Sequence, residues 1–126
     1  MPPEPWLPPS TFYVDGWRVT LIWRQTPAGP ACVGVTVLAD PDSDRRLVAA
    51  TVNTLSIADL IARGPVPDRL RRAVDAYLWA GENQVPRAKA VAAEVGIAET
   101  SASNLISKIR NEMRLLPPTR PGVSAA

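Results

Sequence analysis

Residues 86–113 contain two short amphipathic stretches separated by one glycine, and this pattern constrains the fold more than any other part of the chain. Val91, Ala92 and Val95 share one helical face of the first stretch. Gly96 follows directly and supplies the positive φ that a tight turn after a helix requires. Apolar residues then recur at helical spacing at positions 102, 105, 106, 109 and 113. The pattern predicts two helices that meet at a tight turn.

The side chains around this turn favour a helix-turn-helix. Ala92 lies four residues before Gly96, where only a small side chain lets the two helices approach closely. Ile97 follows the glycine as a hydrophobic plug, and the second helix begins about two residues later. Because a helix-turn-helix commonly carries its second helix into the DNA major groove, double-stranded DNA is the expected partner.

Two further helices are predicted before this motif. The periodicity of residues 68–80 is the clearest in the chain and predicts a support helix for the helix-turn-helix. Its expected buried stripe consists of Leu70, Ala73, Val74, Tyr77 and Leu78. A shorter helix is predicted over 56–63, with Ser56 and Asp59 forming a capping box in which Asp replaces Glu.

The N-terminal half has a period of two, which is typical of strands. Trp17, Val19, Leu21 and Trp23 occupy alternate positions over 17–24, which predicts a half-buried strand. Asp15-Gly16 is expected to form either a bulge or a tight hairpin turn that adds 12–14 as a short partner strand. Residues 32–39 and 47–52 predict two more strands. Since the loops between successive strands are short, we expect an antiparallel meander.

These elements predict an α+β fold, in which a small antiparallel β-meander with a short helix precedes a three-helix helix-turn-helix unit. The expected organisation is a flexible Pro-rich arm over 1–10, the meander with its helix over 11–64, the helix-turn-helix unit over 65–116, and a flexible Pro-rich tail over 117–126.

Composition limits the function classes. The net charge is +2, but residues 1–62 carry four Arg against six acids and residues 63–126 carry ten Arg and Lys against six acids. The basic half therefore contains the helix-turn-helix, as a polyanion binder requires.

The chain has no His and one Cys, Cys32, which we expect to be an inert core thiol. No His-based catalytic site, Cys-rich zinc site or Gly-rich phosphate loop is present, so we expect no enzyme, no cofactor and no metal. Without a signal peptide or a membrane-length apolar run, a cytoplasmic protein is expected.

Residues 66–122 resemble a group of small helix-turn-helix proteins common in high-GC Gram-positive bacteria and their mobile elements. The segments that carry the resemblance are RRAVDAYLWA, then AKAVAAEVGIAETSASNLISKIRNEM, then LLPPTRPG. The resemblance implies sequence-specific DNA binding as a transcriptional regulator or as an accessory factor of a mobile element. Two residues depart from the group's pattern. Ala98 stands where Ser or Thr usually caps the recognition helix, and the helix begins with Glu99, whereas the group tends to have Arg along this helix.

The candidate DNA contacts follow from the phase of the second helix. At 100° per residue, the face opposite its apolar stripe carries the compact hydrogen-bonding side chains that read bases. These base-facing candidates are Thr100, Ser103, Asn104, Ser107, Lys108 and Asn111. The phosphate-contacting candidates are Arg87 and Lys89 on the preceding helix and Arg110 and Arg114 at the far end of the recognition helix. Arg120 in the tail is a further candidate for a minor-groove contact.

The expected function is therefore a DNA-binding transcriptional regulator that inserts helix 99–113 into the major groove as a homodimer, with the meander serving for dimerisation or partner docking. Two alternatives remain open. One is a protein-interaction module on a helix-turn-helix scaffold that no longer binds DNA, which Ala98 and Glu99 favour. The other is a mobile-element accessory factor, such as an excision factor or an antitoxin.

Overall fold

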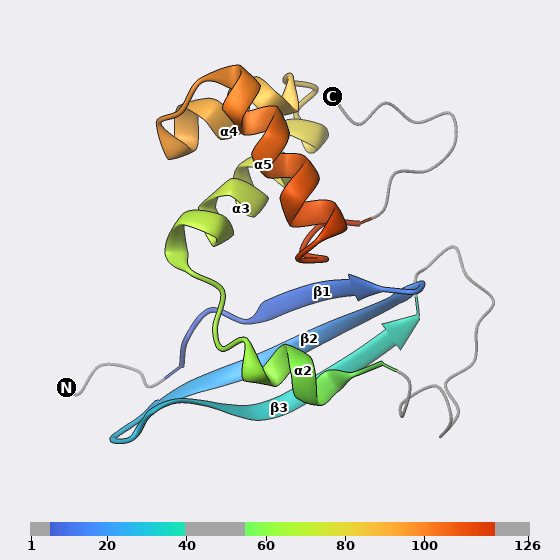
Figure 1. Cartoon of the computed structure of the whole chain (residues 1–126), viewed down its shortest axis with the longest axis vertical. Helices are drawn as coiled ribbons and strands as arrows, with labels where there is room; N and C mark the ends of the chain where they lie inside the picture. The colour runs from blue at the N-terminus through green and yellow to red at the C-terminus, as the bar shows by residue number, and fades with distance from the viewer. Residues whose placement is uncertain (1–5, 40–54, 118–126) are drawn as a thin grey trace. The chain divides into compact units, whose positions relative to one another are not determined.

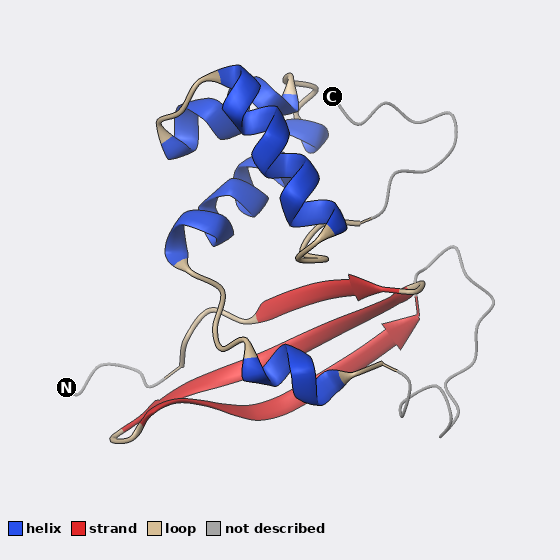
Figure 2. Cartoon of the chain, in the orientation of Figure 1, coloured by secondary structure: helices blue, strands red, loops and turns tan. Residues whose placement is uncertain are grey.

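The chain forms two compact units, a sheet unit (Met1–Val66) and a helical unit (Pro67–Ala126). The computed structural model describes residues 6–39 and 55–117. Three antiparallel strands precede the helices along the chain, so the predicted α+β class is confirmed (Figure 2). The predicted strand over 47–52 lies outside the described residues, as do positions 1–5 of the predicted arm and 118–126 of the predicted tail, including Arg120.

The sheet is a meander with the order β1-β2-β3, formed by Ser10–Val14, Trp17–Thr26 and Gly29–Ala39 (Figure 1). The predicted turn between the first two strands is confirmed, because Asp15 and Gly16 both have positive φ, 50° and 84°. This is the geometry of a two-residue hairpin whose twist matches that of its strands. Before β1, Trp6 forms an isolated bridge with Arg24 of β2, so part of the predicted flexible arm is paired.

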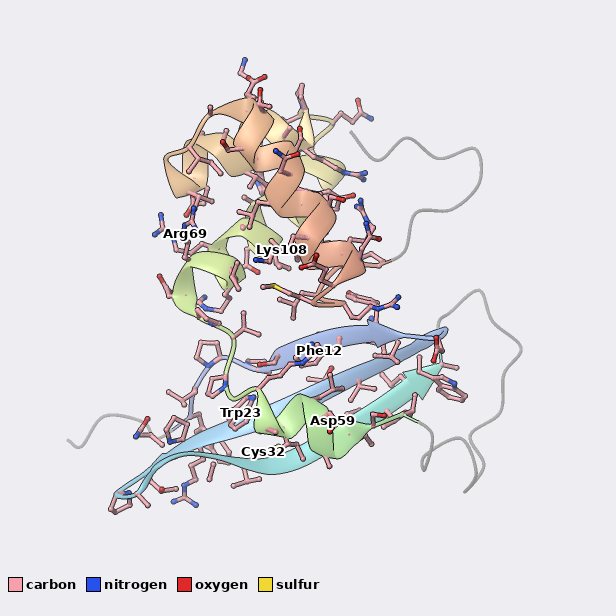
Figure 3. All side chains as sticks on the ribbon, viewed as in Figure 1. Phe12, Trp23, Cys32, Asp59, Arg69 and Lys108 are labelled. Atoms are coloured by element: carbon pink, nitrogen blue, oxygen red, sulfur yellow. The ribbon has the colours of Figure 1, made fainter. Side chains whose placement is uncertain are left out.

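The sheet buries one face, as the alternation in β2 predicts. Trp17, Val19, Leu21 and Trp23 of β2 are all buried, together with Phe12 of β1. Figure 3 labels Phe12 and Trp23 on their strands. The indole nitrogen of Trp23 donates a hydrogen bond of 3.2 Å to the buried Ser10 hydroxyl. Because a buried polar group needs a partner, this bond removes the cost of placing the indole N–H in the core.

The short helix α2 covers Ile57–Ala62 and contributes to the same core. Leu55 and Leu60 are buried, and the Arg63 guanidinium lies 5.9 Å from the centroid of the Phe12 ring. The predicted capping box is wrong: Ser56 has a left-handed backbone (φ 51°, ψ 41°), and its side chain makes no capping hydrogen bond. A capping side chain needs an extended backbone to reach the first-turn amides, and the left-handed conformation turns it away from them.

The helical unit contains α3 (Asp68–Glu82), α4 (Arg87–Val95) and α5 (Glu99–Asn111). The second helix of the predicted helix-turn-helix was expected to run to 113, but α5 ends two residues earlier, at Asn111. There the Met113 N–H bonds to the Lys108 carbonyl and the Leu115 N–H bonds to the Ile109 carbonyl. These bonds reach back five and six residues instead of four, so the chain leaves the helix in a widened turn.

The core of the helical unit is built from one face of each helix and the chain after α5. Its buried side chains are Ala73, Tyr77 and Ala80 of α3, Val91 and Ala92 of α4, Ala102, Ile106 and Ile109 of α5, and Leu115 and Leu116. The predicted stripe on α3 is partly wrong, since Leu78 is 40% exposed while Ala80 is fully buried. Small residues at 73 and 80 let the neighbouring helices approach this face, so the buried stripe is rotated away from Leu78. Among the described residues, no helix is long and apolar enough to cross a membrane.

Candidate nucleic-acid interface

The turn between α4 and α5 has the geometry expected from the sequence. Gly96 adopts a left-handed conformation (φ 73°, ψ 40°), and its N–H and that of Ile97 both bond to the Ala92 carbonyl, at 2.9 and 3.1 Å. These bonds are those of a helix ending on a left-handed glycine. Ala98 is extended, and α5 begins at the next residue. Ala92 of α4 and Ala102 of α5 are both buried. Residues 87–111 therefore form two helices joined by the predicted tight turn.

The exposed face of α5 carries the predicted base-facing side chains. All six are exposed: Thr100, Ser103, Asn104, Ser107, Lys108 and Asn111. The side chains at 102, 106 and 109 on the opposite face are buried, and their burial determines which face of α5 is exposed. The Asn111 amide donates to the Ser107 hydroxyl at 3.2 Å, which links two of these residues along the helix. Lys108, labelled in Figure 3, is the single charged residue of this set.

Of the four predicted phosphate contacts, two project from the surface and two lie against a tyrosine. Lys89 and Arg114 are exposed, whereas Arg87 and Arg110 are half-buried. The Arg87 and Arg110 guanidinium groups lie 4.7 and 5.2 Å from the centroid of the Tyr77 ring. Both groups also donate hydrogen bonds to the Tyr77 hydroxyl, from Arg87 at 3.3 Å.

We call Tyr77, Arg87 and Arg110 the tyrosine cluster. It joins α3, α4 and α5 at one point, and Arg110 also donates to the Pro117 carbonyl at 3.2 Å. The sequence predicted Tyr77 only as a core residue and missed its hydroxyl as a shared acceptor. The available signal was a tyrosine at a core position, since a buried tyrosine hydroxyl needs a hydrogen-bond partner.

The N-terminus of α5 begins without a side-chain cap. Ala98 occupies the N-cap position with the extended backbone that suits it (φ −69°, ψ 153°), but it has no side-chain acceptor for the first-turn amides. Thr100 and Ser101, the next hydroxyl side chains along the chain, are exposed and lie inside the helix. The backbone at Ala98 therefore has the conformation of an N-cap residue, but alanine has no side-chain oxygen that could accept a hydrogen bond from the first-turn amides.

Replacing Ala98 with serine is expected to stabilise the protein by about 1 kcal/mol, because the new hydroxyl would accept a hydrogen bond from an unsatisfied amide of α5. Urea unfolding of the full chain, followed by the helical signal in circular dichroism, measures this change. The matched control is Ala93→Ser, at an exposed position inside α4, which should lower stability by about 0.5 kcal/mol. A loss of stability in both variants would contradict the assignment of Ala98 as an unfilled cap.

A separate hollow lies between α3 and α4. The Arg72 guanidinium meets Glu94 twice, at 3.0 Å from its carboxylate and at 2.7 Å from its backbone carbonyl. Beside this contact is an open groove of about 520 Å³. Trp79, 54% exposed, forms one wall. The remaining lining residues are Arg72, Asp75, Ala76, Ala90, Ala93 and Glu94.

Comparison of the chain with models of known protein families, with curated protein sequences and with solved structures finds no match. Within residues 6–39 and 55–117, no three His, Cys, Asp or Glu side chains are grouped so that they could hold a metal ion.

Proposed function

We propose that this chain is a sequence-specific DNA-binding protein, a transcriptional regulator that inserts α5 into the major groove of double-stranded DNA. The observation that carries the proposal is the geometry of α4, Gly96 and α5. It presents six exposed polar side chains on the face of α5 opposite its buried stripe. A major groove admits an α-helix whose outward side chains reach base edges.

The side chains on this face suit base recognition. An asparagine such as Asn104 pairs with adenine through two hydrogen bonds, and serine and threonine hydroxyls donate to or accept from several bases. Lys89 and Arg114 are exposed cations at the ends of the two helices and are assigned to phosphates. The contacts of Arg87 and Arg110 with Tyr77 already restrict the rotation of both side chains. Each would therefore lose less conformational entropy on binding a phosphate.

The charge distribution of the helical unit supports this assignment. Arg71 pairs with Asp68 and Asp75, and Arg72 pairs with Glu94, so half of the six acids in residues 67–117 are matched by cations of α3. The cations that lie on α4, on α5 or just after it are Arg87, Lys89, Lys108, Arg110 and Arg114. The net positive charge of this unit is therefore associated with the two helices that would face DNA.

We further propose that the protein acts as a homodimer. One helix in one groove buries little surface, and helix-turn-helix proteins usually pair so that two recognition helices read two half-sites. The sheet unit is the assigned dimerisation region because most of the exposed large apolar side chains among the described residues belong to it.

The decisive experiment is fluorescence anisotropy of the full chain with a pool of mixed-sequence duplexes across a salt series. Log K is expected to fall with log salt by about one unit for each phosphate contact. A steep slope supports the proposal and justifies selecting a preferred site from the pool. Absence of binding at low salt, from protein shown by circular dichroism to be folded, would overturn it.

With a selected site in hand, Asn104→Ala should weaken binding to that site by about 1–3 kcal/mol and leave binding to mixed sequence almost unchanged. Lys89→Ala should weaken binding to both by the same factor and reduce the salt slope by about one. Lys89 is a cleaner phosphate variant than Arg87 because its side chain is exposed and lies outside the tyrosine cluster. Equal loss of sequence preference from the two substitutions would contradict the assigned roles.

The second candidate function is a protein-interaction module. The groove between α3 and α4 favours it, because exposed Trp79 and three alanines line a space that a partner's apolar side chain would fill. The uncapped Ala98 and the carboxylate of Glu99 at the start of α5 point in the same direction. The salt series separates the two candidates, since an interaction module of this kind would show no salt-dependent DNA binding.

A further inference from the structure

The outer edge of β3 is the strongest unexplained feature of the sheet unit. β3 has eleven residues and not one charged side chain, and within the described residues it pairs on one side only, with β2. Val33, Val35 and Leu38 are 52%, 41% and 49% exposed. An open strand edge with apolar side chains is a template for pairing with another chain.

Proteins usually block such edges with charges, prolines or bulges, and β3 has these devices only in its first half. Pro30 lies near its start. Val33 is an extra residue in the ladder, since Ile22 pairs with Gly34 while Trp23 pairs with Cys32. From Gly34 to Ala39 the ladder is regular and contains no proline and no charge. Within the part of the chain that the structure describes, the second half of β3 is therefore unprotected.

We propose that a second copy of this chain pairs with this edge, antiparallel to β3, around a two-fold axis at Thr36. The six strands of the two copies would then form one continuous sheet. A strand without charges pairs with its own copy without bringing like charges together, and two-fold dimers are the commonest symmetric assemblies. The inference deepens the homodimer of the proposed function by naming its surface, and it does not depend on DNA binding.

The register follows from the two faces of the sheet. Val35 and Val37 lie opposite Leu21 and Val19 of β2 and so belong to the core face. A two-fold axis perpendicular to the sheet keeps core face with core face, and a slip of one residue would break this match. With the axis at Thr36, Val35 pairs with Val37 of the partner subunit, and the core face continues across the dimer. Cross-strand pairs of β-branched residues are favourable in antiparallel sheets.

The outer face fits the same register. Gly34 lies opposite Ile22 on this face, and the Ile22 Cδ1 atom is 3.2 Å from the point where a Cβ on Gly34 would stand. Leu38 of the partner subunit falls opposite Gly34, where it would meet the Ile22 side chain that lies over the glycine. The exposed apolar surface of Ile22 and Leu38 is thereby covered. An axis at Val35 would instead place the bulged Val33 only two residues from the axis, opposite Val37 of the partner subunit, and would shorten the regular part of the new ladder.

Disulfide trapping tests the register directly. In a Cys32→Ser background, Thr36→Cys places two thiols opposite each other on the axis, within the Cα separation that a disulfide spans. Mild oxidation is expected to give a covalent dimer on a non-reducing gel. The matched control is Thr20→Cys, which lies on the same face but on the central strand β2. Cross-linking of Thr36→Cys no greater than that of Thr20→Cys would overturn the register.

Light scattering of the full chain, without DNA, tests the dimer itself. The unmodified protein is expected to be a dimer, and Val35→Lys should weaken dimerisation about tenfold or more because it places a charge at the new ladder. Trp79→Lys, at an exposed aromatic of the helical unit, should leave the dimer intact.

A monomeric unmodified protein would overturn the inference and would favour the strand predicted over 47–52 of the same chain as the partner of this edge of β3. Loss of the dimer in Trp79→Lys but not in Val35→Lys would also overturn it and would move the interface to the helical unit. A monomer that binds DNA would leave the proposed DNA-binding function standing, whereas a β3-paired dimer that does not bind DNA would leave only this inference standing.

Discussion

Replacing Ile109 with alanine is expected to lower the free energy of unfolding of the helical unit by about 2–5 kcal/mol. Ile109 is 1% exposed and lies on the face of α5 that carries Ala102 and Ile106. Its truncation removes apolar contacts and leaves a cavity among helices that cannot close fully around it. Because single domains are stable by only about 5–15 kcal/mol, a loss of this size threatens the folded state of α5. Urea unfolding followed by circular dichroism measures it.

Two controls locate the effect. Ile109→Val removes one methylene group and should lower the free energy of unfolding by about 0.5–1.5 kcal/mol. Leu21→Ala truncates a fully buried side chain of β2 in the sheet unit. It should lower the stability of the sheet unit, so the unfolding transition followed by the fluorescence of Trp17 and Trp23 should move to lower urea concentration. If Ile109→Ala and Ile109→Val lowered stability equally, the side chain of Ile109 would not fill a closed core.

The parts of the fold that could be predicted are those that local periodicity determines. In β2, alternation alone identified Trp17, Val19, Leu21 and Trp23 as one face, and all four are buried. The turn at Gly96 was equally accessible, because a left-handed residue at a helix end is a local requirement that glycine meets without strain. Local rules of this kind do not depend on what packs against the element.

The errors arose where another element decides the outcome. On α3, the predicted stripe and the observed one are adjacent, and the small residues at 73 and 80 select the second by letting other helices approach. At α2, the pair of Ser56 and Asp59 matched a capping pattern, but Ser56 has a left-handed backbone that excludes the cap. Neither constraint is visible in the segment itself.

In the candidate interface, too, local periodicity places some residues while contacts with another helix place others. Exposure of the side chains at 100, 104 and 107 follows from the phase of α5, so their placement on its outer face could be predicted. The positions of Arg87 and Arg110 could not, because both depend on a hydroxyl from α3. Two residues assigned from the sequence to phosphates alone therefore also join three helices, and substitutions at either one will change stability together with binding.

The tyrosine cluster leads to the second large effect, in which Tyr77→Ala should lower the free energy of unfolding by about 3–5 kcal/mol and Tyr77→Phe by about 1–2 kcal/mol. The alanine variant loses the buried ring and the contacts of both guanidinium groups with it. The phenylalanine variant keeps the ring and these contacts and loses only the hydroxyl that accepts from Arg87 and Arg110. Urea unfolding of the three proteins separates the two contributions.

The same pair of variants distinguishes a structural cluster from one that also positions cations for DNA. If the hydroxyl holds both guanidinium groups in place for phosphates, Tyr77→Phe should weaken binding to mixed-sequence DNA while the circular dichroism spectrum remains that of the folded protein. Lys89→Ala in the Tyr77→Phe background should then add its own loss independently, because Lys89 lies outside the cluster. Unchanged DNA binding with reduced stability would assign the cluster to the helical core alone and leave Lys89 and Arg114 as the phosphate contacts.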